Sequence, residues 1–416
     1  MANKTYSIVK RINDNMKKTH PKKSPDTASQ TKNKTYEKSS IFVLLLSFVI
    51  FLGALFLIYS KDILNGAGEI FTSQSERIAE YETAAVVEIV NESVKAEEIT
   101  DGSLSGSQEL KVIIKSGRYK GEEMIANNYF YPLNGVPASK GDNVTLLIKT
   151  YADGERYASV YEINRIPVLA VFLLLFFLVV IKIGGLTGLK SLIGLIFTII
   201  CLFAILIPML LKGAPTVLTT FIMCAYIALV NFTILGGIHR KTISAFLGTV
   251  SGTFLALVFG MAVQYLSKID GYRLEDAEPL YQLKYAGVPI HIQGLLTASI
   301  IICALGAVMD VAMSISSSLE EVHTANPAYS RTELFRSGMN IGRDMVGTMT
   351  NTLILAFLGS EFTLIIFLYS RSMTFYHLFS TAFIVLETIS GISSSIGMIL
   401  AIPLTALISS TLIKKS

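Results

Sequence analysis

Charge is scarce in this chain. Asp, Glu, Lys and Arg make up 16% of its 416 residues, against about a quarter in typical soluble domains. The deficit is uneven, because residues 1–40 and 60–165 are ordinarily polar while long runs after Arg165 hold no charge at all. The pattern therefore predicts an α-helical integral membrane protein rather than an apolar soluble one.

Tryptophan is absent, so any aromatic belt at a membrane interface must be built from tyrosine and phenylalanine. Only three cysteines occur, and Cys201, Cys224 and Cys303 all lie inside apolar runs without Cys-x-x-Cys or Cys/His spacing. We expect them to be small buried side chains, neither disulfide-bonded nor metal-bound.

Catalytic fingerprints are also missing. The chain contains no nucleophile elbow, no Walker A loop, no HExxH helix and no dinucleotide-binding glycine pattern. These absences remove any specific enzyme assignment, so we expect no enzymatic activity, no cofactor and no metal site.

The sequence divides into four segments. Residues 1–40 hold ten Lys or Arg against three acidic residues, which predicts a disordered, basic cytoplasmic tail. Attraction to anionic lipid or nucleic acid is the alternative for this tail, but its position before a span favours a topogenic role, and we expect no nucleic-acid partner. Residues 41–59 are uncharged and long enough to form a transmembrane anchor; a cleaved signal peptide is the alternative.

Residues 60–165 carry alternating apolar runs separated by turn signals such as Asp101-Gly102, Asn134-Gly135 and Gly141-Asp142. Short strands at this spacing predict a small β-rich extracytoplasmic domain, either a barrel or a sandwich.

Residues 166–416 predict a bundle of seven further helices, which makes about eight in all. The expected spans are 166–182, 190–211, 214–237, 242–266, 292–315, 345–369 and 380–412. Gly359-Ser360-Glu361 and the run from Gly391 to Gly397 interrupt the last two, and either could be a broken helix around a cavity. With eight crossings, the basic loops and both termini share one side, which the positive-inside rule makes cytoplasmic.

Polar residues inside the spans are the candidate functional residues. Asp310 and Ser314 share one helical face, and Thr348 and Asn351 share a face of the following span. The two spans run antiparallel, so we expect Asp310 to face the bundle interior and to meet Thr348 or Asn351, with Gly306 and Gly347 letting the backbones approach. The alternative role for Asp310 is a structural hydrogen bond, and the alternative role for the face of Thr348 and Asn351 is simple helix packing. The secondary candidates are Arg343, Asp344, Glu361 and Glu387.

Two strings of residues carry a family resemblance. Residues 306–312, Gly-Ala-Val-Met-Asp-Val-Ala, and residues 342–353, Gly-Arg-Asp-Met-Val-Gly-Thr-Met-Thr-Asn-Thr-Leu, resemble the YibE/F-like bacterial membrane proteins. The β-rich insert and the bundle after it also look like that family's layout. The resemblance implies a multipass protein of the bacterial plasma membrane, and it implies no particular substrate or reaction.

These observations favour a transporter or permease-like protein of unknown substrate. The alternative is a non-transporting membrane scaffold or sensor whose β domain binds a partner, and an intramembrane enzyme ranks third. The expected partners are the lipid bilayer and either another membrane protein or a second copy of the chain. A water-accessible cavity reaching Asp310 would favour transport, whereas a dry, tightly packed bundle would favour a scaffold.

Overall fold

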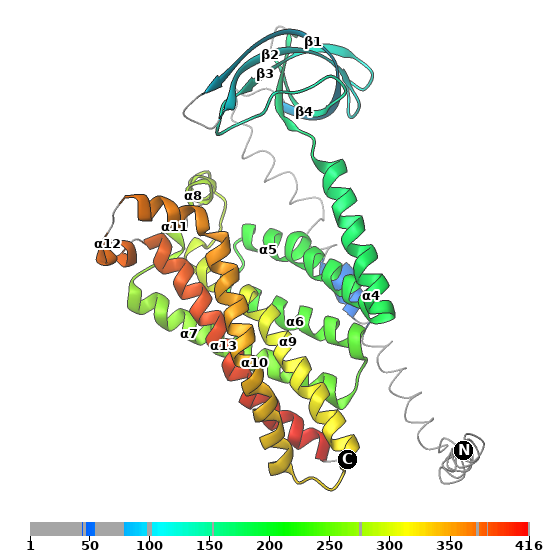
Figure 1. Ribbon diagram of the computed structural model, residues 1–416, viewed down its shortest axis with the longest axis vertical. Helices are drawn as coiled ribbons and strands as arrows, with labels where there is room; N and C mark the ends of the chain where they lie inside the picture. Colours follow the sequence, from blue (N-terminus) through cyan, green and yellow to red (C-terminus); the bar gives the residue numbers. More distant parts are fainter. Residues whose placement is uncertain are drawn as a thin grey trace, which may run out of the picture. The chain divides into compact units, whose positions relative to one another are not determined.

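The computed structural model describes residues 44, 47–54, 79–97, 102–151, 154–273, 277–371, 374–380 and 382–414. The expected basic tail lies outside these residues. Of the expected anchor, residues 44 and 47–54 are described and are helical. The chain forms two compact units, one containing a β-barrel and the other containing most of the helices, and each is described by itself (Figure 1).

The β unit is a closed five-stranded barrel, which decides between the barrel and the sandwich left open above. Its strands pair in the order β1-β2-β3-β5-β4 and close through a β1–β4 pair, with β3 and β5 parallel. This is the strand order of an OB-type barrel. The strands are β1 (Ala79–Glu97), β2 (Ser103–Ile114), β3 (Glu123–Phe130), β4 (Asn143–Thr150) and β5 (Arg156–Ile163).

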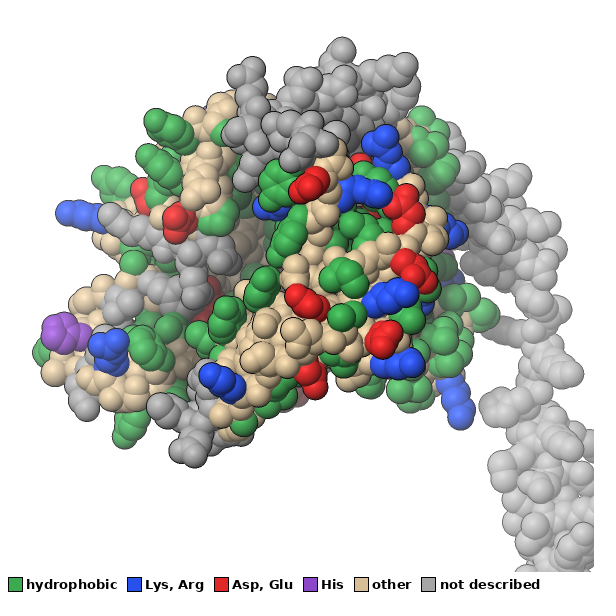
Figure 2. Space-filling model, turned by 90° about the horizontal axis from the view of Figure 1, so that it is seen from above, with side chains coloured by type: hydrophobic (Ala, Val, Ile, Leu, Met, Phe, Trp, Pro, Cys, Tyr) green, Lys and Arg blue, Asp and Glu red, His purple; other side chains and the backbone are tan. Residues whose placement is uncertain are grey.

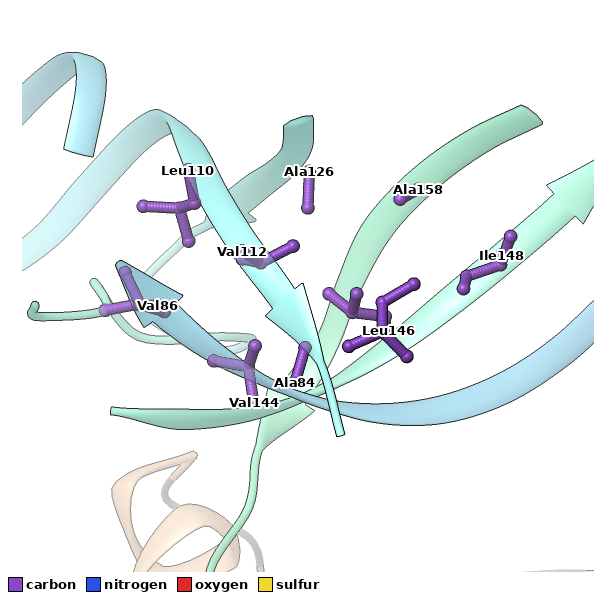
Figure 3. Close-up of a cluster of buried hydrophobic side chains, with 11 residues drawn as sticks. Ala84, Val86, Leu110, Val112, Ala126, Val144, Leu146, Ile148 and Ala158 are labelled. Carbon is purple, nitrogen blue, oxygen red and sulfur yellow. The ribbon is translucent and has the colours of Figure 1, made fainter. Parts of the chain in front are cut away.

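Alternation along the strands builds the barrel core. In β4 every second residue is buried from Val144 to Ile148, and β2 follows the same rule from Leu110 to Ile114. Figure 3 shows these side chains converging from different strands. The outer surface carries interspersed acidic and basic side chains (Figure 2), as expected for a surface in contact with water.

The helices are α4 (Ile166–Ile200), the π-helix η2 (Cys201–Leu206), α5 (Ile207–Leu211), α6 (Thr216–Gly236), α7 (Arg240–Ser267), α8 (Ala277–Tyr285), α9 (Leu295–Ala325), α10 (Arg331–Ser360), α11 (Phe362–Ser370), α12 (Phe375–Ser380) and α13 (Ala382–Lys414). Within the described residues, five helical stretches are long and apolar enough to cross a membrane, and the bent pair of α10 and α11 would make a sixth. The count of eight spans stays a prediction.

The longest stretch, Ile166–Leu211, is not one regular helix. Gly185 has a φ of 56° and a ψ of −137°, which breaks the helical backbone at this position. A straight helix of 46 residues would be about 69 Å long, more than twice the hydrocarbon thickness. The break falls between the two spans expected at 166–182 and 190–211.

Glycines allow the helices at the centre of the bundle to pack closely. A Cβ built on Gly252 of α7 would lie 2.6 Å from the Ala401 Cβ of α13 and 2.7 Å from a Val308 methyl of α9. A Cβ on Gly397 would lie 2.4 Å from that of Ala256. Such close approaches are typical of membrane helix packing, and they explain why α7, α9 and α13 lie side by side (Figure 1).

One expected helix break is present and the other is absent. α10 ends at Ser360, and α11 leaves at an angle of 61°, so the break expected at Gly359-Ser360-Glu361 is confirmed. The prediction of a break between Gly391 and Gly397 is wrong, because α13 is continuous from Ala382 to Lys414. Gly391 instead allows α10 to pack closely, since a Cβ on this residue would lie 3.1 Å from the Phe357 ring of α10.

Candidate functional site

A cavity of about 460 Å³ lies where α10, α11 and α13 meet. Its walls are mostly aliphatic and aromatic, and its polar side chains are Glu361, Glu387 and Thr388. The remaining lining residues are Ile354, Phe357, Leu358, Leu364, Ile365, Ile384, Gly391 and Ile392. An apolar pocket with a few converging polar groups is the usual form of a small-ligand site.

Glu361 occupies the break itself. Its backbone N–H donates to the Phe357 carbonyl at 3.2 Å, and its carbonyl accepts from the Ile365 N–H at 3.0 Å. The bend therefore keeps these backbone groups paired, which a break at membrane depth requires. The side chain that projects from this bend is half-buried and lines the cavity.

Glu387 and Thr388 reach the same cavity from α13. Glu387 is half-buried, and the Thr388 hydroxyl donates to the Ile384 carbonyl at 2.7 Å in its own helix. The contact of Phe357 with Gly391 positions α10 against α13 beside these two residues. The structure thus brings together two of the secondary sequence candidates, Glu361 and Glu387.

Glu361 and Glu387 are the acidic residues of a cavity whose surface is almost wholly apolar. A carboxylate inside a membrane protein needs a cation, a proton or a strong hydrogen-bond donor to offset its desolvation. Acidic residues in such a cavity are candidates for binding a small cation or for taking up protons. The apolar walls would accommodate hydrocarbon groups attached to such a cation.

Asp310 lies elsewhere, and the orientation expected for it is not what the structure shows. The side chain is exposed on the outer face of α9, and within the described part of the chain it makes no hydrogen bond. The cavity lining does not include Asp310. The reason is that the inner face of α9 consists of small and apolar side chains, among them Ala304, Val308 and Ala312.

The other primary candidates share this outward direction. Ser314 is exposed on α9, and Thr348 and Asn351 are exposed on α10. The Thr348 hydroxyl donates to the Met345 carbonyl of its own helix at 3.1 Å. Arg343 and Asp344 are also exposed, and neither forms an ion pair with another described residue.

Gly306 and Gly347 do not bring the two helices together either, contrary to expectation. A Cβ built on either glycine would meet nothing within 4 Å. The contact is made nearer the α9–α10 connection, where a Cβ on Gly338 would lie 3.0 Å from Leu319 and one on Gly342 would lie 3.4 Å from Ile315.

Two features of the arrangement escaped the sequence analysis. Thr388 was not singled out, although it directly follows Glu387. The packing face of α7 was also missed, although small residues recur there at every fourth position. These residues are Ser244, Gly248, Gly252, Ala256 and Gly260, and all five are buried. That spacing is a known signal for close helix contact.

Comparison with known proteins gives one match. The family model described as YibE/F-like protein matches residues 172–415, which is more than half of the chain. The matched residues include α9, α10, α11 and α13 and begin after the barrel. No curated protein and no solved structure matches the chain.

Proposed function

The chain belongs to the YibE/F-like family, and we propose that it is a membrane transporter that binds a cation or protons in the cavity between α10, α11 and α13. We further propose that it resides in the bacterial plasma membrane with both termini in the cytoplasm. Its several long apolar helices support the membrane setting.

The observation that carries this proposal is the placement of Glu361 and Glu387 in one cavity at a broken helix. Broken helices in membrane proteins occur where they line a cavity, and in transporters they form ion and substrate sites. Acidic residues within spans mark ion or proton pathways by default. Asp310, the leading candidate from the sequence, does not line the cavity, so the proposal does not rest on it.

The experiment is a flux measurement with purified protein in liposomes. A membrane potential is applied, and entry of H⁺, Na⁺ and a quaternary ammonium ion is recorded with matched dyes. We expect one of these fluxes to exceed that of empty liposomes and to fall at least about tenfold in Glu361→Gln/Glu387→Gln, because the amides keep the shape but not the charge.

The control is Glu321→Gln, which removes an exposed carboxylate near the end of α9 and should leave the flux unchanged. Flux equal to that of empty liposomes for every cation would contradict transport. Equal flux in the double variant and the wild type would contradict the assignment of the cavity.

A sensor or scaffold remains the alternative, and one observation favours it. Tyr129, Tyr131 and Tyr157 are exposed on one side of the barrel at 54%, 58% and 38%. The Tyr129 hydroxyl donates a hydrogen bond to Tyr157, which raises the pKa of Tyr129 and shows that these two rings are neighbours. Exposed tyrosines are common in binding surfaces.

The two functions predict opposite genetic results. In a deletion strain with a measurable growth defect, a sensor would lose complementation with Tyr129→Ser/Tyr131→Ser and keep it with Glu361→Gln/Glu387→Gln. A transporter using the cavity would show the reverse pattern.

A further inference from the structure

The cavity between α10, α11 and α13 is larger than a bare ion requires. Its volume of about 460 Å³ falls in the range of about 300–1,000 Å³ that is typical of sites for small organic molecules. Apart from Glu361, Glu387 and Thr388, every lining residue is Ile, Leu, Phe or Gly. Most of the surface of a molecule in this cavity would therefore contact hydrocarbon.

The close approaches between α10 and α13 show how the two acids are placed. A Cβ on Gly338 would lie 2.9 Å from the Cβ of Ala406. A Cβ on Gly391 would lie 3.1 Å from the Phe357 ring. Higher residue numbers on α10 thus meet lower residue numbers on α13, so the two helices run antiparallel.

Glu361 and Glu387 lie at the same level of these two helices. Glu361 follows Phe357 by four residues, which is about one helical turn. Glu387 precedes Gly391 by the same number. Because the helices are antiparallel, both steps lead in the same direction from the contact of Phe357 with Gly391. The two acids are therefore neighbours in the wall of the cavity.

The cavity has acidic side chains but no basic one. None of the described residues that line it is Lys, Arg or His. The side chain of Glu361 forms no hydrogen bond or ion pair with another described residue, and the Thr388 hydroxyl donates to its own helix. A positive charge on the ligand would offset the desolvation of the carboxylates.

A bare metal ion does not match these residues. Ca²⁺ and Mg²⁺ take about six or more oxygen ligands, whereas the lining side chains provide two carboxylates and one hydroxyl. Within the described part of the chain, no three His, Cys, Asp or Glu side chains are grouped so that they could hold a metal ion. A cation that carries its own hydrocarbon fits better, since it needs few oxygen ligands and fills the apolar space.

We propose that the ligand of this cavity is an alkylated ammonium ion, whose nitrogen lies beside Glu361 and Glu387 and whose alkyl groups contact the apolar wall. Aromatic rings also attract such ions, and Phe357 is part of the wall. Apolar lining residues lie on both sides of Glu387 along α13, at Ile384 and Ile392, so alkyl groups can extend either way. The assignment of this ligand class rests on the cavity being the cation site proposed above.

The test is equilibrium dialysis of the purified protein in nanodiscs of zwitterionic lipid, with binding to empty nanodiscs subtracted. The probes are hexyltrimethylammonium, tetramethylammonium, Na⁺ and hexan-1-ol. The first two probes differ only in alkyl length. Hexyltrimethylammonium and hexan-1-ol share the alkyl chain but differ in charge.

We expect hexyltrimethylammonium to bind at least about tenfold more tightly than tetramethylammonium, because each buried methylene group contributes up to about fourfold in affinity. It should also bind at least about tenfold more tightly than hexan-1-ol, which lacks the charge that the carboxylates require. Na⁺ at the same concentration should not displace it.

Two substitutions separate the role of charge from that of the wall. Glu361→Gln should weaken binding of hexyltrimethylammonium about tenfold and leave that of hexan-1-ol unchanged, since the amide keeps the shape. Ile392→Ser, at a lining residue that is 49% exposed, should weaken hexyltrimethylammonium several-fold and leave tetramethylammonium unchanged. Glu321→Gln is the control and should change neither affinity. A variant without a monodisperse elution profile is set aside, and the comparison of probes on the wild type then decides.

The proposal is overturned if the wild type binds hexan-1-ol as tightly as hexyltrimethylammonium, as a site for neutral lipid chains would. Equal binding of tetramethylammonium and the longer ion, or no saturable binding of the longer ion, also overturns it. Dialysis requires no transport, so binding without flux in liposomes would contradict transport and keep the ligand class. Conversely, H⁺ or Na⁺ flux that the glutamate double variant loses, without binding of hexyltrimethylammonium, would keep the proposed function and refute the ligand class.

Discussion

Glu82 is a buried carboxylate of the barrel, with an exposed fraction of 7%. It accepts hydrogen bonds from the Ser116 hydroxyl at 2.6 Å and from the Arg118 N–H at 3.2 Å. Gly117 between these partners has a φ of 64°, and a Cβ there would lie 1.5 Å from the Glu82 carboxylate. One side chain thus fixes the turn between β2 and β3, and only glycine fits beneath it.

Replacing Glu82 by alanine should lower the free energy of unfolding of the barrel by about 1–3 kcal/mol, because two partly buried donors lose their acceptor. Urea denaturation followed by circular dichroism measures the change. Glu109→Ala, which removes an exposed carboxylate of β2, is the control and should change stability by less than about 0.5 kcal/mol. Equal losses in both variants would contradict a special role for Glu82.

Residue orientation is where sequence reasoning about the candidate site reached its limit. Helical spacing placed Asp310 and Ser314 on one face, and the structure agrees that they share a face. Spacing does not reveal which face of a helix the bundle covers, because inside a membrane both polar and small residues can mark a contact. The α9 face that packs inward carries Ala304, Val308 and Ala312, and a preference for small residues over charged ones would have selected it.

The barrel is the element most open to an isolated test. Its five strands close on one another, and its buried residues form a cluster of their own. We expect a segment of residues 79–165 to fold alone as a soluble domain, since a closed barrel leaves no unpaired edge. Circular dichroism should show β-structure and one cooperative melting transition. Leu110→Asp, which places a charge in the core, should abolish the transition, and a helical or non-cooperative spectrum of the parent segment would contradict the expectation.

Docking of α10 on α13 depends on Gly342. A Cβ at this position would lie 2.1 Å from a methyl group of Ile402, so Gly342→Ala must push the helices apart. We expect the melting temperature of the detergent-solubilised protein to fall by several degrees. Gly359→Ala, where a Cβ meets nothing within 4 Å, is the matched control on the same helix and should not lower it. A fall of the same size in both variants would show that loss of glycine itself, rather than the contact, is responsible.

Breaks and turns of single elements were predictable in part. The Ser-x-x-Glu spacing from Ser330 to Glu333 is typical of a capping box, and both of its hydrogen bonds are present at the start of the 30-residue helix α10. α10 ends at Ser360, directly after Gly359, while the glycines at 391 and 397 lie within a continuous helix. The difference is tertiary, because Phe357 and Ala256 pack against the latter two, and no local pattern contains those partners.

At the scale of the whole molecule, hydropathy predicted a β-rich segment followed by apolar helices, and both are present. The number of membrane crossings is not fixed by length and apolarity alone. Ile166–Leu211 contains the break at Gly185, and α10 with α11 forms a bent pair. Each of these features can count as one crossing or as two, so topology requires a direct measurement.

Labelling of single cysteines in intact cells supplies that measurement. With the native cysteines replaced, Leu133→Cys on the barrel and Tyr285→Cys at the end of α8 should react with an impermeant thiol reagent, because the positive-inside pattern places both outside. Both positions are well exposed, at 100% and 87%, so failure to react would not reflect burial. Gly271 in the same loop as Tyr285 is unsuitable, since a Cβ there would lie 2.0 Å from the Ile292 carbonyl oxygen. The control on the cytoplasmic side is Glu321→Cys, exposed near the end of α9, which should react only after permeabilisation. If Glu321→Cys were labelled in intact cells, or Tyr285→Cys were not labelled in them, eight crossings with cytoplasmic termini would be refuted. Glu361 and Glu387 would then lie at a different depth in the membrane.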